Sequence, residues 1–284
     1  MSPDQPSPSG FSSFDEVEVH GGYSTAEAKP LADIGGLVLR YQGFEAASPV
    51  MFSDRVQADL FIPVIINFGE RWAIASGGRQ AASHDSFTAG LIDRYTAIEC
   101  AGRPSCLQID FTPFGARAFF GRPLHELTSS VIAFADVAGR DGGAFVERLA
   151  ELPDWRSRLQ LADRLVRQRL RGAAPVNRRV SAGWRRLAAQ GGRLSIRDLA
   201  AELDCSREHL TRLFREQAGH SPKAIARIMR YHAVKRIAPG LGCDWAATAY
   251  EAGYADQAHL IREFRQMSGE TPTAWAASHS FNTP

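Results

Sequence analysis

The sequence predicts an α+β protein, with an N-terminal antiparallel β-rich, barrel-like domain and connecting helices, followed by an all-α domain. Three observations predict this architecture. Short β-like runs occupy much of the first 111 residues, amphipathic helical patterns follow them, and the last third of the chain repeats itself at an offset of fifty residues. With 284 residues, two domains are the default, and each is long enough to bury a core of its own.

The N-terminal domain follows a polar segment. Residues 1–13 are rich in Ser and Pro, and we expect them to be disordered. From about Gly35 onward, apolar runs alternate with glycine and polar breaks, which is typical of an antiparallel sheet or a small barrel. The expected strands are 37–41, 60–68, 72–75, 87–91 and 106–111.

Helical patterns replace the strands after residue 111. A helix can begin at Thr112-Pro113 and end at Gly121, and two amphipathic helices follow at 143–152 and 155–170. The Gly and Pro residues of the next segment interrupt this pattern. We therefore expect a sensor or dimerisation domain over 14–171, a linker over 172–177 and a second domain over 178–279, whose first helix is 178–189.

The second domain contains the internal repeat. The run 209–215 matches 259–265 in His, Leu, Arg, Phe and Arg, and the match extends to Gly219 and Gly269. Ser206 and Asp256, both good N-cap residues, occupy equivalent positions upstream. Such a repeat indicates two copies of one supersecondary unit, here a short helix, a tight turn and a second helix that ends at a glycine. A long helix from Pro222 to about Ala238 joins the two units.

The exposed face of each second helix favours DNA binding over the alternative, an all-α bundle with two similar hairpins. Arginines and short polar residues near the start of a helix are what a major-groove reader presents to base edges. We take 206–218 and 256–268 as the recognition helices. Their candidate DNA-contacting residues are Arg207, Glu208, Thr211, Arg212 and Arg215 in the first, and Gln257, Ala258, Ile261, Arg262 and Arg265 in the second.

These residues resemble a known family. The pattern G-Y-x-D-Q-x-H-L-x-R-x-F-R-x-x-x-G-x-T-P, present as Gly253 through Pro272, is similar to the DNA-binding domain of the AraC/XylS family of bacterial transcription regulators. The resemblance covers a little under a third of the chain. It implies two helix-turn-helix units that enter successive major grooves on one side of the DNA. Glu208, Ala258 and Ile261 depart from the polar, basic character expected at such positions, so the preferred sequence does not follow by analogy.

The stretch 63–139 resembles the N-terminal domain of one poorly characterised subgroup of these regulators. The residues that carry this resemblance are Thr112 to Arg117, Gly121 to Leu124 and Glu126 to Thr128. It implies a sensor or dimerisation module followed by helices.

Charge and cysteine content agree with a DNA-binding protein of the cytoplasm. From Arg178 onward there are 16 basic and 10 acidic residues, a net of +6, whereas the residues before it have 17 basic and 21 acidic, a net of −4. The positive charge thus lies with the domain that would meet phosphates. The four cysteines have no zinc-ligand spacing, so we expect reduced thiols, no metal and no cofactor. We find no apolar run of membrane-spanning length and no signal-peptide pattern, and therefore expect a cytoplasmic protein without membrane association.

We expect no enzymatic activity in the N-terminal domain. It lacks the common catalytic motifs, and before Arg178 the only histidines, His20, His84 and His125, are far apart in sequence. The residues that could line a ligand pocket are Tyr41, Phe68, Trp72 and Tyr95, although core packing is the favoured explanation for them.

The sequence therefore predicts a sequence-specific transcription regulator that binds double-stranded DNA, with an N-terminal domain that senses an effector or mediates dimerisation. An enzyme domain that modifies a small molecule, fused to a DNA-binding module, is the alternative. Candidate partners besides DNA are a small-molecule effector, a protein partner, RNA polymerase and a second copy of the chain as a homodimer. The sequence leaves open whether the effector is a small molecule or a protein.

Overall fold

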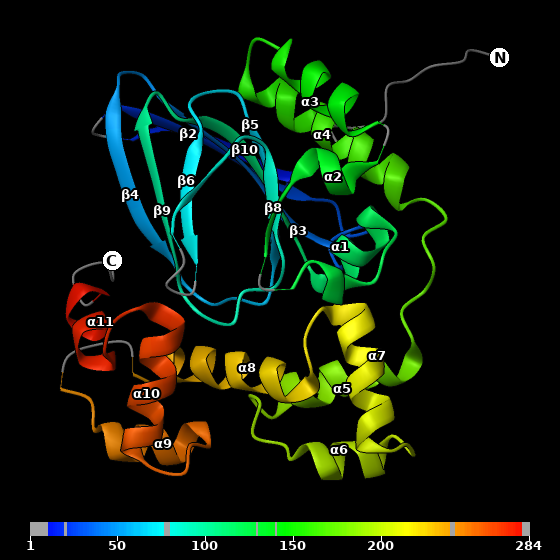
Figure 1. Ribbon diagram of the computed structural model, residues 1–284, viewed down its shortest axis with the longest axis vertical. Helices are drawn as coiled ribbons and strands as arrows, with labels where there is room; N and C mark the ends of the chain where they lie inside the picture. Colours follow the sequence, from blue (N-terminus) through cyan, green and yellow to red (C-terminus); the bar gives the residue numbers. More distant parts are fainter. Residues whose placement is uncertain are drawn as a thin grey trace.

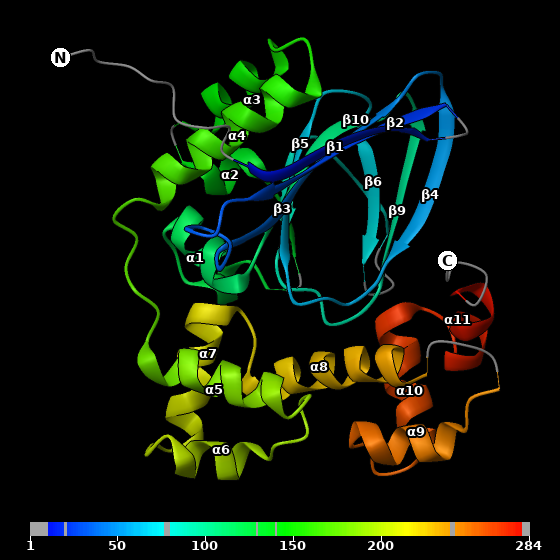
Figure 2. The same ribbon diagram turned by 180° about the vertical axis from the view of Figure 1, so that it is seen from behind.

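The structure, a computed structural model, describes residues 11–19, 22–76, 80–128, 130–139, 141–238 and 242–279. Figures 1 and 2 show a β-rich domain with its own helices, stacked on a helical domain in which two groups of helices lie at opposite ends of α8. Of the expected disordered segment, residues 1–10 lie outside the described residues. Residues 11–13 are instead the start of the first strand, which pairs with the second.

The described strands form two antiparallel sheets. The strands are β1 (Phe11–Val19), β2 (Tyr23–Pro30), β3 (Val38–Ala46), β4 (Val50–Val56), β5 (Ile62–Asn67), β6 (Trp72–Ser76), β7 (Ala82–His84), β8 (Phe87–Ala89), β9 (Thr96–Gly102), β10 (Ser105–Phe111) and β11 (Val131–Ala133). One sheet has the order β1-β2-β3-β10-β5-β8-β11 and the other β4-β9-β6-β7. The two sheets share a core that includes Ile65, Trp72, Phe87 and Cys100. The described strands thus form an open pair of sheets rather than a closed barrel.

All five expected strands are present, but the sequence pattern missed the strands that bury little large apolar surface. In β2 the buried side chains are the small ones of Ala26, Ala28 and Pro30. In β4 no side chain is fully buried. Alanine and charged residues, which carry little β-propensity, make up much of β2, and Ser53-Asp54-Arg55 interrupts the apolar residues of β4, so neither segment stood out in the sequence.

The helices of the N-terminal domain cover one face of the larger sheet. They are α1 (Pro113–Phe120), the short 3-10 helix η1 (Leu124–Glu126), α2 (Phe134–Ala138), α3 (Gly142–Ala150) and α4 (Trp155–Leu170). Close contact fixes α4 to β3, because a Cβ atom at Gly43 would lie 2.3 Å from the Trp155 ring. The buried hydroxyl of Tyr41 also donates a hydrogen bond to Asp163 on α4 at 3.0 Å. Burial, with the nearby Asp163 charge, raises the pKa of Tyr41 well above its ordinary value.

The C-terminal domain consists of the two helix-turn-helix units and the helix that joins them. Its helices are α5 (Arg178–Ala189), α6 (Ile196–Glu202), α7 (Arg207–Ala218), α8 (Pro222–Ile237), α9 (Trp245–Ala252), α10 (Gln257–Ser268) and α11 (Pro272–His279). These boundaries agree closely with those expected from caps and apolar periodicity. None of the helices in the described part of the chain is long and apolar enough to cross a membrane.

Helix α8 contributes to two hydrophobic cores. Ile225 and Met229 belong to the core of the first unit, together with Phe214 of α7. Tyr231 and Val234, farther along α8, belong to a cluster that continues through the second unit and into the N-terminal domain. The second unit and the N-terminal domain therefore share one continuous apolar interior.

We expect Phe214→Ala to destabilise the first unit by about 3–5 kcal/mol, because removing a fully buried ring leaves a cavity. Denaturant unfolding of the full chain measures this effect. Tyr250→Ala is the control, since that ring is 87% exposed on α9 and should change stability little. A Phe214→Ala protein that unfolds like the wild type would show that the ring is not part of the core.

Candidate nucleic-acid interface

The first recognition helix, α7, begins and ends at residues that satisfy its backbone. The Ser206 hydroxyl accepts a hydrogen bond from the His209 amide at 3.1 Å. Gly219 ends the helix with a φ of 82°, a conformation that favours glycine. Because one face of α7 is buried against α5, α6 and α8, the opposite face is turned to solvent.

The second recognition helix, α10, is built in the same way. Asp256 accepts a hydrogen bond from the His259 amide at 2.6 Å, and Gly269 ends the helix with a φ of 84°. The buried face carries Leu260 and Phe264. The residue pairs Ser206 and Asp256, and Gly219 and Gly269, thus perform the same tasks fifty residues apart.

The ten residues expected to contact DNA lie on the outward faces of these two helices. The exposed ones are Arg207, Glu208, Arg212, Arg215, Gln257, Ala258, Arg262 and Arg265, and the half-buried ones are Thr211 and Ile261. The structure therefore brings together the five residues predicted for each helix.

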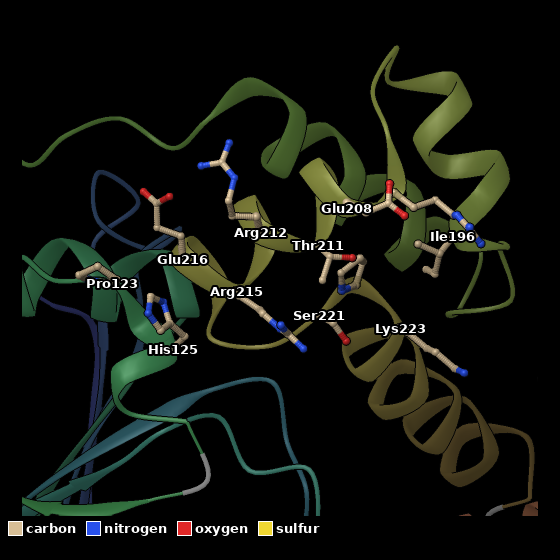
Figure 3. A pocket seen from close by; sticks show the side chains of 12 residues that line it. Pro123, His125, Ile196, Glu208, Thr211, Arg212, Arg215, Glu216, Ser221 and Lys223 are labelled. Atoms are coloured by element: carbon tan, nitrogen blue, oxygen red, sulfur yellow. The ribbon is translucent and has the colours of Figure 1, made fainter.

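The outward face of α7 forms one wall of a hollow of about 970 Å³ (Figure 3). Arg207, Arg212 and Arg215 line it from α7, and Lys223 lines it from the first turn of α8. The N-terminal domain contributes His125 of η1. Sequence reasoning missed Lys223 and His125, because neither lies on a recognition helix and only the fold places them beside one.

The five arginines on the recognition helices have no carboxylate partner among the described residues, whereas Arg186, Arg197, Arg227 and Arg230 of the same domain each have one. Within the described part of the chain, no Asp or Glu lies within ion-pair distance of the five recognition-helix arginines. By contrast, Arg186 pairs with Glu202, and Arg227 pairs with Glu263, at 2.7 and 2.8 Å. The unpaired charges are available for phosphates or base edges.

Glu208 has a local role that accounts for an acidic side chain in a basic surface. Hydrogen bonds from its own backbone amide and from the Ser206 hydroxyl lower the pKa of the Glu208 carboxyl. A carboxylate in the first turn of a helix also interacts favourably with the helix dipole. Glu208 therefore supports the start of α7 whether or not it reaches a base.

The two units differ in how they are attached to α8. In α7 the position equivalent to Glu263 is the buried Leu213. In α10, the Glu263 side chain is 12% exposed and lies 2.8 Å from Arg227 and 3.5 Å from Arg230, both on α8. His259 of α10 lies 3.3 Å from the same carboxylate. A largely buried network of charges thus fixes α10 to α8, whereas an apolar contact fixes α7.

The four residues suggested as pocket-lining in the N-terminal domain do not come together. Tyr41 is fully buried against α4, and Phe68 packs against Trp155. Tyr95 is 39% exposed and lies against the end of α10. Of these four residues, only Trp72 lines the cavity between the two sheets.

That cavity, of about 700 Å³, lies between the two sheets and has a graded lining. Phe44, Phe52 and Trp72 form its aromatic part. Arg40, which pairs with the buried Asp110 at 2.6 Å, lies four residues along β3 from Phe44 and gives the cavity a charged part. Lys235 of α8 also lines it, so the cavity reaches the DNA-binding domain. No group of three or more His, Cys, Asp or Glu side chains that could hold a metal is found among the described residues.

Two family models match separate parts of the chain. Residues 199–278 match the model of a helix-turn-helix domain, and residues 26–133 match a domain of unknown function (DUF6597). Among curated proteins, none matches the sequence of the chain.

Similar solved structures include ToxT from Vibrio cholerae, at 8% identity over 81% of this chain and 98% of that one, with a TM-score of 0.43. CuxR, an AraC-like transcriptional activator, is 15% identical over 84% of this chain and 91% of that one, with a TM-score of 0.33. The xylose-binding transcription activator XylR is 11% identical over 45% of this chain and 40% of that one, with a TM-score of 0.34. At these identities and TM-scores, the three similarities do not assign a function to this chain.

The paired units, together with the domain match over 199–278, show that the C-terminal part of the chain is a helix-turn-helix domain. The matched range includes the pattern from Gly253 to Pro272 that the sequence analysis singled out.

We expect Glu263→Leu to destabilise the protein by about 3–5 kcal/mol, although leucine is the natural residue at the equivalent position of the first unit. The substitution leaves Arg227 and Arg230 largely buried without a counter-charge, at 25% and 16% side-chain exposure. Replacing both arginines by methionine in the same protein should restore most of the loss. Thermal unfolding compares the two variants, and equal melting of Glu263→Leu and wild type would contradict the proposed role of the network.

Proposed function

We propose that α7 and α10 read two successive major grooves on one side of a DNA duplex. The observation that carries this proposal is the set of five arginines without carboxylate partners on the outward faces of two equivalent helices. The two helices cross opposite ends of α8 in both views (Figures 1 and 2). A 16-residue helix is a rod about 24 Å long, which suits a fixed pair of readers.

Arg212 and Arg262 occupy equivalent positions on the two helices and are the strongest candidates for base contacts. Arginine can bond bidentately to guanine in the major groove, or it can hold a phosphate. Thr211 and Gln257 offer shorter polar groups for base edges, and Arg215 and Arg265, one turn farther along, suit the phosphates beside the groove. Lys223 at the start of α8 would add a phosphate contact next to α7.

We further propose that the N-terminal domain senses a small molecule in the cavity between its sheets. The lining combines the aromatic rings of Phe44, Phe52 and Trp72 with charged and amide side chains, so a ligand with both an apolar and a polar part would suit it. Two lining residues meet across the domain boundary: Lys235 of α8 donates a hydrogen bond to Gln57 of the N-terminal domain at 3.0 Å. Burial lowers the pKa of Lys235. A molecule in the cavity would therefore touch both domains.

An enzymatic N-terminal domain has less support. Its buried carboxylates, Asp110 and Asp163, are bonded to Arg40 and Arg167 and so are occupied by structural contacts. We propose that the protein acts on DNA in the cytoplasm. Dimerisation of the chain and contact with RNA polymerase would both suit such a regulator.

We expect Arg212→Ala to weaken specific DNA binding by about 1–3 kcal/mol. If Arg212 reads a base, the preference at one position of the site relaxes. If it holds a phosphate, the affinity for every DNA sequence falls by the same factor. The slope of log affinity against log salt concentration then falls in magnitude by roughly one. Binding titrations at several salt concentrations separate the two, with Arg148→Ala on α3 as the control. Unchanged affinity and unchanged salt dependence would remove Arg212 from the interface.

We expect the spacing of the two subsites to be critical. If both helices dock on one face of the duplex, the subsites lie about one helical turn apart, 10–10.5 base pairs. Inserting five base pairs between them places the second subsite on the opposite face, and inserting a full turn exceeds the reach of α8. Footprinting should show loss of specific binding at both insertions. Recovery at the full-turn insertion would exclude a rigid pair of readers.

A further inference from the structure

The N-terminal domain contacts both recognition helices at the same place, their C-terminal ends. At the end of α7, the Thr128 hydroxyl donates a hydrogen bond to the Gly219 carbonyl at 2.6 Å. The next residue, His220, has its Nε2 atom 2.9 Å from the Leu91 carbonyl.

The end of α10 is held by backbone amides of the same domain. Ala58 and Tyr95 donate to the carbonyls of Met267 and Gln266 at 2.9 and 3.0 Å. These carbonyls belong to the last turn of α10, where a helix has no partners of its own to offer. The Tyr95 ring also lies over Gly269, because a Cβ atom added at that glycine would come 3.1 Å from the ring.

One loop of the N-terminal domain reaches both helices. Leu91 and Tyr95 both lie between β8 and β9, four residues apart, which is a span of on the order of 14 Å at most. The Leu91 carbonyl contacts His220 of the first unit, and the Tyr95 amide and ring contact the end of α10 in the second. The loop has little freedom at its start, since a Cβ atom at Gly90 would lie 2.0 Å from the Leu127 carbonyl oxygen. The loop 90–95 is therefore a short, firmly held connection between the ends of α7 and α10.

We propose that the loop 90–95, with Thr128, sets the distance between the two recognition helices, so that the N-terminal domain determines which operator spacing the full chain accepts. This inference rests on the proposed reading of DNA by α7 and α10. Helix α8 holds α7 by core packing and α10 by core packing together with the charges around Glu263. The contacts of the N-terminal domain with the C-terminal ends of both helices add a second constraint on the distance between them. Tyr95 and Thr128 are then positioning residues that touch no DNA.

The test uses the full chain and a set of operators in which the distance between the two subsites changes by one or two base pairs. We expect the wild type to prefer one spacing over its neighbours by about tenfold, equivalent to 1.4 kcal/mol. Tyr95→Ala combined with Thr128→Val removes the ring from Gly269 and the donor from Gly219. This variant should bind the best operator with affinity close to wild type, and its preference among spacings should fall to about threefold or less.

Matched variants separate positioning from stability. Tyr95→Phe combined with Thr128→Ser keeps the ring and the hydroxyl and should keep the wild-type preference. Tyr250→Ala combined with Thr273→Val removes the same groups from exposed positions of the C-terminal domain and should also keep it. Unchanged spacing preference in a Tyr95→Ala, Thr128→Val protein that melts normally would overturn the inference, as would equal loss of binding at every spacing. Failure of the wild type to bind any operator specifically would instead count against the proposed function.

Discussion

Helix α8 is the constraint on which the arrangement of the protein depends, because it is buried along most of its length by three different partners. Its first half completes the core of the first helix-turn-helix unit, and its second half completes the core of the second. Tyr231 of the same helix donates a hydrogen bond to Gln57 of the N-terminal domain at 2.5 Å. A helix that is buried or half-buried around most of its circumference cannot rotate or slide without opening one of these cores. Helix α8 therefore fixes where each unit is attached, and the contacts of the N-terminal domain with the ends of α7 and α10 add a second constraint.

The sequence was most informative where local rules and tertiary packing agree. In the C-terminal domain, Ser206 and Asp256 cap their helices and Gly219 and Gly269 end them, so the boundaries and the outward faces could be predicted from residue type and spacing. The N-terminal domain was less predictable, since β2 buries alanines and β1 is rich in polar residues. Contacts between domains leave no periodic signal at all. For that reason Tyr95 resembled a pocket residue in the sequence, whereas its ring lies against the end of α10.

Charge in the C-terminal domain is divided between two tasks that composition cannot distinguish. Arg227 and Arg230 neutralise Glu263 in the interior, while the arginines of the recognition faces have no carboxylate partner among the described residues. A net charge of +6 for this part of the chain counts both kinds together. The second helix-turn-helix unit, which contains the charges around Glu263, also shares its apolar interior with the N-terminal domain. The two repeats thus have the same succession of helices but differ in the contacts that attach them to the rest of the protein.

The bond between Lys235 and Gln57 joins residues 178 positions apart, and this separation has a consequence for biosynthesis. The N-terminal domain leaves the ribosome first and can fold before α8 and α10, two of the helices that contact it, have been synthesised. Its amides at Ala58 and Tyr95 must stay bonded to water until residues 266 and 267 have emerged. Contacts of such high sequence separation form slowly. Docking of the two domains is therefore the step at which a nascent chain is most exposed to mispairing with a neighbouring copy.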